Sequence, residues 1–163
     1  MKTLDKISGK IVGLEALTTA RLQYKTSGKK VVFSNGCFDI LHLGHVEYLS
    51  KAKDLGDILV IGLNTDESIK RIKGPERPVQ DNCTRATILA ALQFVDHVVF
   101  FDQDTPAELI SKIIPDVLVK GADYKIENII GADVVLKNGG EVKTIDLTEG
   151  HSTTNIINKL LHK

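Results

Sequence analysis

The chain has 163 residues, and its 21 basic and 21 acidic side chains give a formal net charge of zero. This length suits one domain with one hydrophobic core, and the balanced charge argues against a general nucleic-acid-binding protein. The sequence has no apolar run of membrane-spanning length, no signal-peptide core near its start, and only two cysteines, too few for a metal or disulfide framework. We therefore expect a soluble, reduced, cytoplasmic protein whose partners include neither nucleic acid nor a membrane.

Short apolar runs alternate with amphipathic helical patterns along the chain. A leading helix is predicted at 13–25, followed by strands at 30–33, 57–63, 97–101, 116–119 and 141–147. Further helices are predicted from about 41 to 56 and at 67–72, 84–94, 105–114, 126–137 and 152–161, with a loop at 73–80. Asp66 is expected to cap the 67–72 helix, and Thr105–Glu108 to form a capping box with Pro106 in the first turn.

This alternation of strands and helices predicts βαβ units. We expect an α/β fold: a single-domain, Rossmann-like, doubly wound parallel sheet of about five strands, with a leading N-terminal helix. Residues 1–28 are assigned to a helical extension packed on the domain, and residues 29–163 to the domain itself. Such sheets bind ligands at the carboxyl ends of their strands, so the candidate loops follow Phe33, Leu63, Phe101, Val119 and Leu147.

The first of these loops contains two histidines, in the stretch SNGCFDILHLGH. His42 and His45 are three residues apart, so they share a face in the first turn of the following helix. The free N–H groups and the helix dipole there favour an anion, and Gly44 leaves space for close approach. Ordinary core or surface histidines explain an isolated pair equally well. A zinc site is less favoured, because no second cysteine or histidine pair completes a ligand set.

The last loop leads into the final helix with Ser152, Thr153 and Thr154. An ordinary N-cap explains these hydroxyls. They also lie at a strand end and at a helix start, where hydroxyl and amide groups can hold phosphate oxygens. Two such loops, far apart in the sequence, favour a polyphosphate ligand more strongly than either loop alone.

The segment GCFDILHLGH resembles the G-x-F-D and H-x-G-H signature of the nucleotidyltransferase superfamily, which includes the cytidylyltransferases. Ser152–Thr154 resemble the second signature of that superfamily. The resemblance implies that His42 and His45 bind the nucleoside triphosphate and stabilise charge on its α-phosphate, while the hydroxyls bind the β- and γ-phosphates. It places Asp39 near the reacting phosphates or their Mg²⁺. His151 departs from the pattern, because relatives more often have an apolar residue or cysteine there, and its role is open.

The same resemblance assigns further residues to the site. Lys73 and Arg85 are expected to act in catalysis with the two histidines, and Lys73 and Arg77 to reach the acceptor, although a solvated loop explains Lys73 and Arg77 as well. Asn64 and Asp66 are expected to line the acceptor pocket, although Asp66 is equally a helix cap. The 73–80 loop is a candidate lid. The other nucleotide-binding residues expected are Asn35, Gly36, Cys37, Phe38, Gly44, Lys120, Gly121 and Asp123. Cys37 is interpreted as a small buried residue rather than a catalytic thiol.

From residue 31 to 160 the chain is similar to the adenylyltransferases of ADP-heptose synthesis, notably in NGCFDILHLGHVEYL, PDVLVKGADY and GHSTT. This similarity implies transfer of AMP from ATP, with Mg²⁺, to D-glycero-β-D-manno-heptose 1-phosphate for surface glycan synthesis, by a homodimer. One alternative is a cytidylyltransferase that uses CTP and a polyol or amino-alcohol phosphate, and another is a non-catalytic nucleotide sensor. A dinucleotide oxidoreductase and a P-loop NTPase are disfavoured, because neither glycine motif is present.

Overall fold

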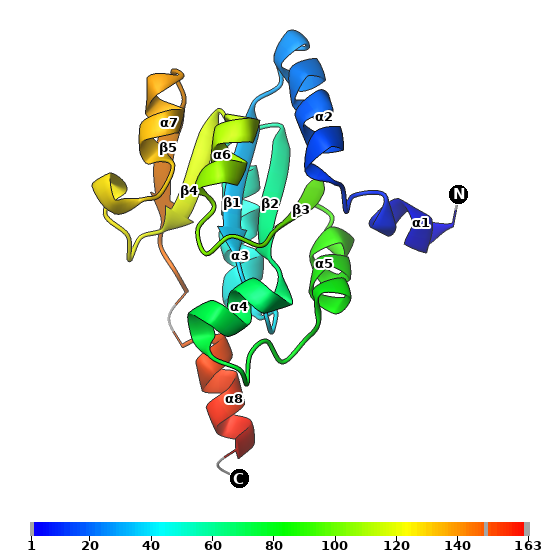
Figure 1. The fold of residues 1–163 in the computed structure, drawn as a ribbon, viewed down its shortest axis with the longest axis vertical. Coiled ribbons are helices and arrows are strands. Elements are labelled where there is room, and N and C mark those ends of the chain that lie inside the picture. The colour runs from blue at the N-terminus through cyan, green and yellow to red at the C-terminus, as the bar shows by residue number, and fades with distance from the viewer. Residues whose placement is uncertain (1, 149, 162–163) are drawn as a thin grey trace.

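A five-stranded parallel sheet forms the centre of the computed structural model, which describes residues 2–148 and 150–161 (Figure 1). The strand order is β3-β2-β1-β4-β5, and every pairing is parallel. The strands are β1 (Val31–Gly36), β2 (Ile58–Asn64), β3 (His97–Phe101), β4 (Val117–Gly121) and β5 (Glu141–Ile145). The predicted α/β class and the doubly wound, Rossmann-like sheet are confirmed.

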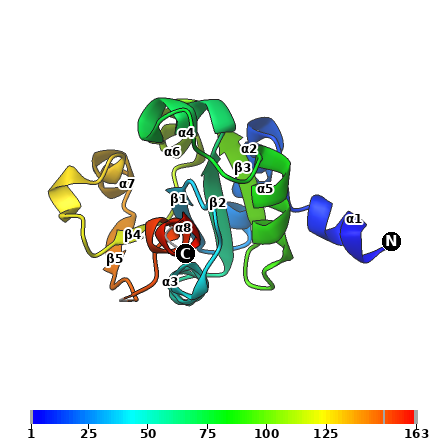
Figure 2. The ribbon, with the colours of Figure 1, turned by 90° about the horizontal axis from the view of Figure 1, so that it is seen from below.

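Helices cover both faces of the sheet (Figures 1 and 2). Side chains of α2, α6 and α7 pack on one face, and those of α3 and α5 pack on the other, with α1 beside α5. The helices are α1 (Thr3–Ser8), α2 (Leu14–Thr26), α3 (Leu43–Lys53), α4 (Asp66–Lys73), α5 (Asn82–Ala91), α6 (Ala107–Ile113), α7 (Ala132–Lys137) and α8 (Thr153–Leu161), with a short 3-10 helix at Ile126–Asn128. The helices between the strands serve as crossover connections, which parallel strands require.

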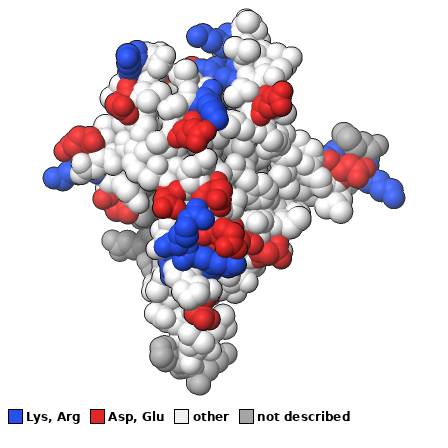
Figure 3. Space-filling model, in the orientation of Figure 1, with Lys and Arg blue, Asp and Glu red and all other residues white. Residues whose placement is uncertain are grey.

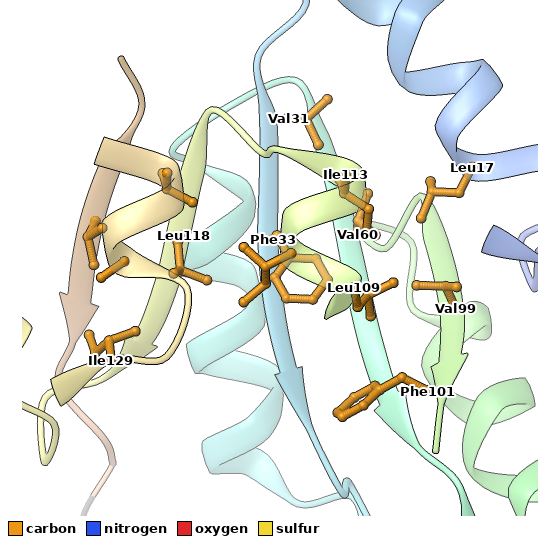
Figure 4. Close-up of a cluster of buried hydrophobic side chains, with 14 of the residues drawn as sticks. Leu17, Val31, Phe33, Val60, Val99, Phe101, Leu109, Ile113, Leu118 and Ile129 are labelled. Atoms are coloured by element: carbon orange, nitrogen blue, oxygen red, sulfur yellow. The ribbon is translucent and has the colours of Figure 1, made fainter. Parts of the chain in front are cut away.

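The core consists of two apolar layers separated by the sheet. Along β1, Val31 and Phe33 point into the layer under α2 and α6, while Val32 points into the layer under α3 and α5. Figure 4 shows the first layer, where Phe33 and Leu109 of α6 lie together between the strands and the helix. Each fully buried side chain of this size contributes about 1.5–3 kcal/mol. Burial on both faces explains why the strands read as continuous apolar runs.

Three local predictions were wrong. The helix predicted at 126–137 is interrupted at Gly131, whose φ of +86° is not helical. The position requires glycine, since a Cβ there would lie 2.7 Å from Ile110 Cδ1. The cap of α4 is Thr65, whose hydroxyl accepts the Ser68 N–H at 3.2 Å, rather than Asp66. The predicted capping box before α6 does not form, since Pro106 is the N-cap and no side chain bonds there.

The N-terminal segment adds an element that the sequence did not predict, the short helix α1. After it, the backbone pairs with β3: the Val12 N–H donates to Val98 O, and the Val98 N–H donates to Lys10 O, both at 2.9 Å. Leu17 of α2 is 1% exposed and belongs to the same core layer as Phe33. The division of the chain at residue 28 stays a prediction.

Charges of both signs are mixed on the face shown in Figure 3. The cluster over α4 pairs Lys70 with Glu67 at 2.7 Å and Arg71 with Asp104 at 2.9 Å. Within residues 2–148 and 150–161, none of the helices has the length and apolar character needed to span a bilayer.

Candidate functional site

A cavity of about 580 Å³ opens at the carboxyl ends of the strands. It lies where the strand order reverses, beside β1 and β4, which is where doubly wound sheets bind their ligands. Figure 2 looks toward this end of the sheet, with α8 in front of β1 and next to α3. The cavity is lined by the end of β1, the starts of α3 and α8, the end of α4 and the loops after β3, β4 and β5.

Two imidazoles form one wall of the cavity. β1 ends at Gly36, and the chain turns through Phe38, whose φ of +44° is unusual for a residue with a side chain, before α3 begins. His42 is the N-cap of α3 and His45 lies in its first turn, so the prediction that the pair shares the helix start is confirmed. Their ring centroids are 3.8 Å apart and the rings are nearly parallel, at 22°. The edge of Phe38 packs against His45, at 5.1 Å between centroids.

Burial favours the neutral form of both imidazoles. The pKa of His45 is lowered to about 4, mainly by burial and in smaller part by the nearby His42 and Lys73. Burial also lowers the pKa of His42, with a smaller contribution from His151. The Nδ1 atoms of His42 and His45 are buried and have no hydrogen-bond partner among the described residues. Since buried polar atoms normally have partners, this arrangement indicates a ligand that supplies them.

Hydroxyl groups at the start of α8 face the same cavity. Ser152, Thr153 and Thr154 all line it, so the structure brings together the two motifs that the sequence placed far apart. Ser152 also acts as an ordinary cap, because its Oγ accepts the Asn155 N–H at 3.0 Å. Thr153 Oγ1 donates to Ile40 O at 3.4 Å, which ties the start of α8 to the loop that carries the histidines.

Cationic side chains approach the cavity from two sides. Lys120, at the end of β4, has its Nζ 3.4 Å from Asn35 O, and burial lowers its pKa to about 8 although Asp123 opposes the shift. Lys73 and Arg77 line the opposite side, from the end of α4 and the loop after it. The other predicted residues that line the cavity are Asn35, Gly36, Cys37, Phe38, Asp39, Gly44, Asn64, Gly121 and Asp123.

Cys37 lines the cavity without the features of a nucleophile. Burial raises the pKa of its thiol, and this outweighs the opposite effect of Lys73 and Arg85. The side chain is only partly exposed, and its Sγ lies 4.0 Å from Asn64 Oδ1. Because the thiolate is the reactive form, this geometry favours a packing role.

The expected role of Asp39 needs a correction: the residue lines the cavity, but its carboxylate is held by protein donors, and any contact with substrate or Mg²⁺ stays a prediction. Its side chain is 1% exposed, and protein donors occupy both carboxylate oxygens. The Val79 and Gln80 N–H groups donate to Oδ1 at 2.8 and 3.0 Å, and Arg77 Nε donates to Oδ2 at 2.6 Å. Burial raises the pKa of Asp39, but the hydrogen bonds from Gln80, Val79 and Arg77 outweigh it, so the pKa is lowered. Asp39 therefore anchors the 74–81 loop.

The predicted roles of Arg85 and Asp66 need a similar correction, because neither residue lines the cavity. The Arg85 side chain is fully buried and pairs with Asp66 at 2.7 Å. Its other hydrogen bonds go to Cys37 O (2.7 Å), Asn64 O (2.9 Å), Gln80 O (3.0 Å) and Asn82 Oδ1 (3.0 Å). The guanidinium thus joins the ends of β1 and β2 to the loop before α5, and it is buried in the protein rather than exposed to the cavity.

Sequence reasoning missed an apolar wall of the cavity. This wall lies between the hydroxyls of α8 and the end of β4, and it is formed by Tyr124, Ile129, Ile130 and Leu147. All four follow β4 or β5, so the rule that ligands bind at carboxyl strand ends could have found them. The site therefore joins an apolar surface to imidazoles, hydroxyls and cations, which suits a ligand with a flat apolar part and a polyanionic part.

Comparison with known proteins places the chain in a family. The model of the cytidylyltransferase-like family matches residues 33–159, which include both helix starts and the strands between them. The chain belongs to the cytidylyltransferase-like family. The family assignment made from the two motifs is thereby confirmed.

Members similar to this chain include much longer proteins. The chain is 54% identical over 152 residues to the bifunctional protein HldE of Citrifermentans bemidjiense, covering 93% of the chain and 31% of that protein. It is 59% identical over 136 residues to the bifunctional protein HldE of Syntrophotalea carbinolica, covering 83% and 28%. The chain thus spans about a third of the length of these relatives.

A solved structure has a similar fold and a length closer to that of this cytidylyltransferase-like chain. The crystal structure of the lipopolysaccharide core biosynthesis protein from Thermoplasma volcanium has a TM-score of 0.60 and 30% sequence identity. The match covers 76% of this chain and 100% of that protein.

Proposed function

We propose that this chain transfers AMP from ATP to D-glycero-β-D-manno-heptose 1-phosphate, releasing pyrophosphate, for the synthesis of surface glycan precursors. The observation that carries the proposal is the convergence of His42 and His45 with Ser152, Thr153 and Thr154 on one cavity. Both sets lie at helix starts, where N–H groups and the helix dipole favour phosphate. Membership of the cytidylyltransferase-like family supports nucleotidyl transfer as the reaction class.

The choice of acceptor rests on similarity to particular relatives. The segments NGCFDILHLGHVEYL, PDVLVKGADY and GHSTT resemble the adenylyltransferases of ADP-heptose synthesis. The high identity to proteins named HldE and the likeness to a lipopolysaccharide core biosynthesis protein support the same substrate class.

The proposed reaction needs positioning and charge neutralisation rather than a general base. The sugar phosphate is already an anion at neutral pH, so its oxygen attacks the α-phosphorus directly while the bond to the pyrophosphate breaks in line with it. His42 and His45 donate hydrogen bonds to the α-phosphate, where charge shifts in the transition state. Lys73, Arg77 and Lys120 reduce the repulsion between the two anions.

Magnesium is proposed to enter with ATP. The two oxygens of Asp39 are occupied by protein donors. In the described part of the chain, no group of three or more His, Cys, Asp or Glu side chains could hold a metal ion. Mg²⁺ often keeps several waters and is bound through substrate phosphates with few protein ligands, so the residues present suit this mode better than a protein cage.

A screen of pyrophosphate release tests the proposal. ATP and CTP are each incubated with heptose 1-phosphate, glycerol 3-phosphate or ethanolamine phosphate, and reactions without acceptor serve as blanks. We expect release with ATP and heptose 1-phosphate above all other pairs. Preferential release with CTP would assign the chain to the cytidylyltransferase alternative. Tight nucleotide binding without release for any pair would support a sensor. A homodimer stays a prediction, which light scattering would check.

A further inference from the structure

A third imidazole lies beside the histidine pair. His151 lines the cavity immediately before the hydroxyl cluster of α8. Its ring centroid is 6.4 Å from that of His42, with an angle of 23° between the planes. His42 in turn stacks on His45 at 3.8 Å and 22°. Three nearly parallel imidazoles, from segments far apart in the sequence, therefore border one cavity.

Packing keeps His151 close to α3. A Cβ at Gly44 would lie 3.3 Å from His151 Cβ and 3.2 Å from His42 Cε1, so the glycine lets the two histidine segments approach. The loop that carries His151 is tied to α3 by the hydrogen bond of Thr148 with Glu47. After His151, the hydrogen bond from Thr153 Oγ1 to Ile40 O, at 3.4 Å, ties the start of α8 to the loop before α3.

The location of His151 suits a phosphate contact. It directly precedes, in the sequence, the hydroxyls expected at the β- and γ-phosphates, and its ring lies beside that of His42, which is expected at the α-phosphate. Its side chain is exposed, so an N–H can turn toward the cavity without breaking an internal hydrogen bond. Like charges repel when neighbouring imidazoles are protonated, and a polyanion in the cavity would remove that repulsion.

We propose that His151 is a third phosphate-binding imidazole, which donates a hydrogen bond to the β-phosphate of ATP and hence to the leaving pyrophosphate. The inference rests on the proposed function, and it goes beyond the two-histidine motif of the superfamily. It assigns to His151 the discrimination of a triphosphate from a monophosphate. The residue is then a ligand contact, in contrast to Arg85, which acts only through its neighbours.

Calorimetry with three ligands tests this assignment. ATP, AMP and pyrophosphate are titrated into the wild type and the variants His151→Ala, His151→Gln and Asn155→Ala. Removing a hydrogen bond to a charged group should weaken ATP and pyrophosphate binding by about tenfold or more and AMP binding by less than about twofold. Gln offers an N–H near the same place, so His151→Gln should recover most of the loss. Asn155 is exposed in α8, the helix that follows His151, and does not line the cavity, so Asn155→Ala should bind all three ligands normally.

Two results would overturn the inference. Equal weakening of AMP and ATP binding would mean that His151 only supports the ring of His42, and unchanged ATP binding would mean no contact at all. Thermal melting of each variant separates loss of contact from loss of fold. The proposed function can fail separately. If the wild type binds ATP and the variants show the predicted pattern, but no acceptor gives pyrophosphate release, the proposed function fails while the His151 contact stands. If the wild type binds none of the three ligands, both proposals fail.

Discussion

Two groups of polar residues lie together at the carboxyl end of the sheet, and they differ in how their hydrogen bonds are satisfied. Asp39 and Arg85 are each 1% exposed, and protein groups occupy their donors and acceptors. His42 and His45 have buried Nδ1 atoms without a partner among the described residues. Asp39 and the histidines belong to one short motif, so residues of a single signature have separate tasks. The groups with satisfied hydrogen bonds hold loops in place, and the groups without partners line the cavity.

If the residues with satisfied hydrogen bonds, Asp39 and Arg85, are structural, then loss of Arg85 should have the largest effect on stability. Arg85→Met leaves Asp66 and three backbone carbonyls without their donor. Removing one partner of a buried ion pair costs about 3–5 kcal/mol, so we expect the free energy of unfolding to fall by about 3 kcal/mol or more. Urea denaturation measures this change. Arg71→Met is the matched control, because Arg71 is exposed and solvent screens its ion pairs, so its loss should change stability far less. Similar losses in the two variants would contradict the structural role of Arg85.

Loss of His45 should change the rate and leave the fold intact. His45→Ala removes a donor from the α-phosphate, which should cost on the order of 2–4 kcal/mol in the barrier, or roughly a hundredfold or more in turnover. Pyrophosphate release with ATP and heptose 1-phosphate measures the rate, and a thermal melt monitors the fold. His97→Gln is the control histidine, because His97 lies outside the cavity and bonds Tyr24 Oη at 2.7 Å. Normal turnover in His45→Ala would rule out its catalytic role.

A smaller effect on stability is expected when Asp39, which anchors the 74–81 loop, is changed. Asp39→Asn keeps the shape of the side chain, but replaces one acceptor oxygen with an NH₂ group that faces existing donors. We expect a loss of about 1–3 kcal/mol in stability and faster hydrogen exchange at the Val79 and Gln80 amides. The KM for the acceptor should rise because Arg77 loses its partner. Asp102→Asn, at an exposed carboxylate, should leave exchange at both amides unchanged. Undisturbed amides in Asp39→Asn would show that the loop is held by other contacts.

The dependence of stability on pH gives the most gradual change. The pKa of His45 is about 4 in the folded chain, against an ordinary value of 6.5. The unfolded chain therefore binds more protons between these values, so stability falls as the pH drops from about 6.5 to 4, by at most about 1.4 kcal/mol per pH unit for one proton. His42 and His97, whose pKa values are also lowered, add to the same slope. His45→Gln should flatten the curve in this window. The carboxyl of Asp39, with its lowered pKa, contributes to the loss only at more acidic pH. An unchanged slope would mean that the imidazole is well solvated.

Much of the fold could be predicted because the signals are local. The five apolar runs became the five strands, and β3 spans the predicted residues. The break at Gly131 was missed, because the clash with Ile110 depends on how α6 packs against the segment before α7. The cap by Thr65 was missed because Asp66, next to it, satisfies the same local rule.

The chemistry of the candidate site could be predicted from the sequence, but the roles of individual residues could be predicted less well. The two motifs at the starts of α3 and α8 are short local patterns at strand ends, so their location followed once the sheet was known to be parallel. Whether Arg85 points into the cavity or into the protein depends on acceptors from three other segments, which no local pattern records. The same holds for Asp39, whose donors come from residues 77–80.

The pairing of Lys10–Val12 with β3 has a consequence for any shortened form of the chain. Val98 exchanges two backbone hydrogen bonds with this segment, so the outer side of β3 is partly covered. A version beginning at residue 29 would leave that strand free to pair with another molecule and would also take Leu17 out of the core. The opening residues thereby shield the outer edge of β3 from pairing with a further strand.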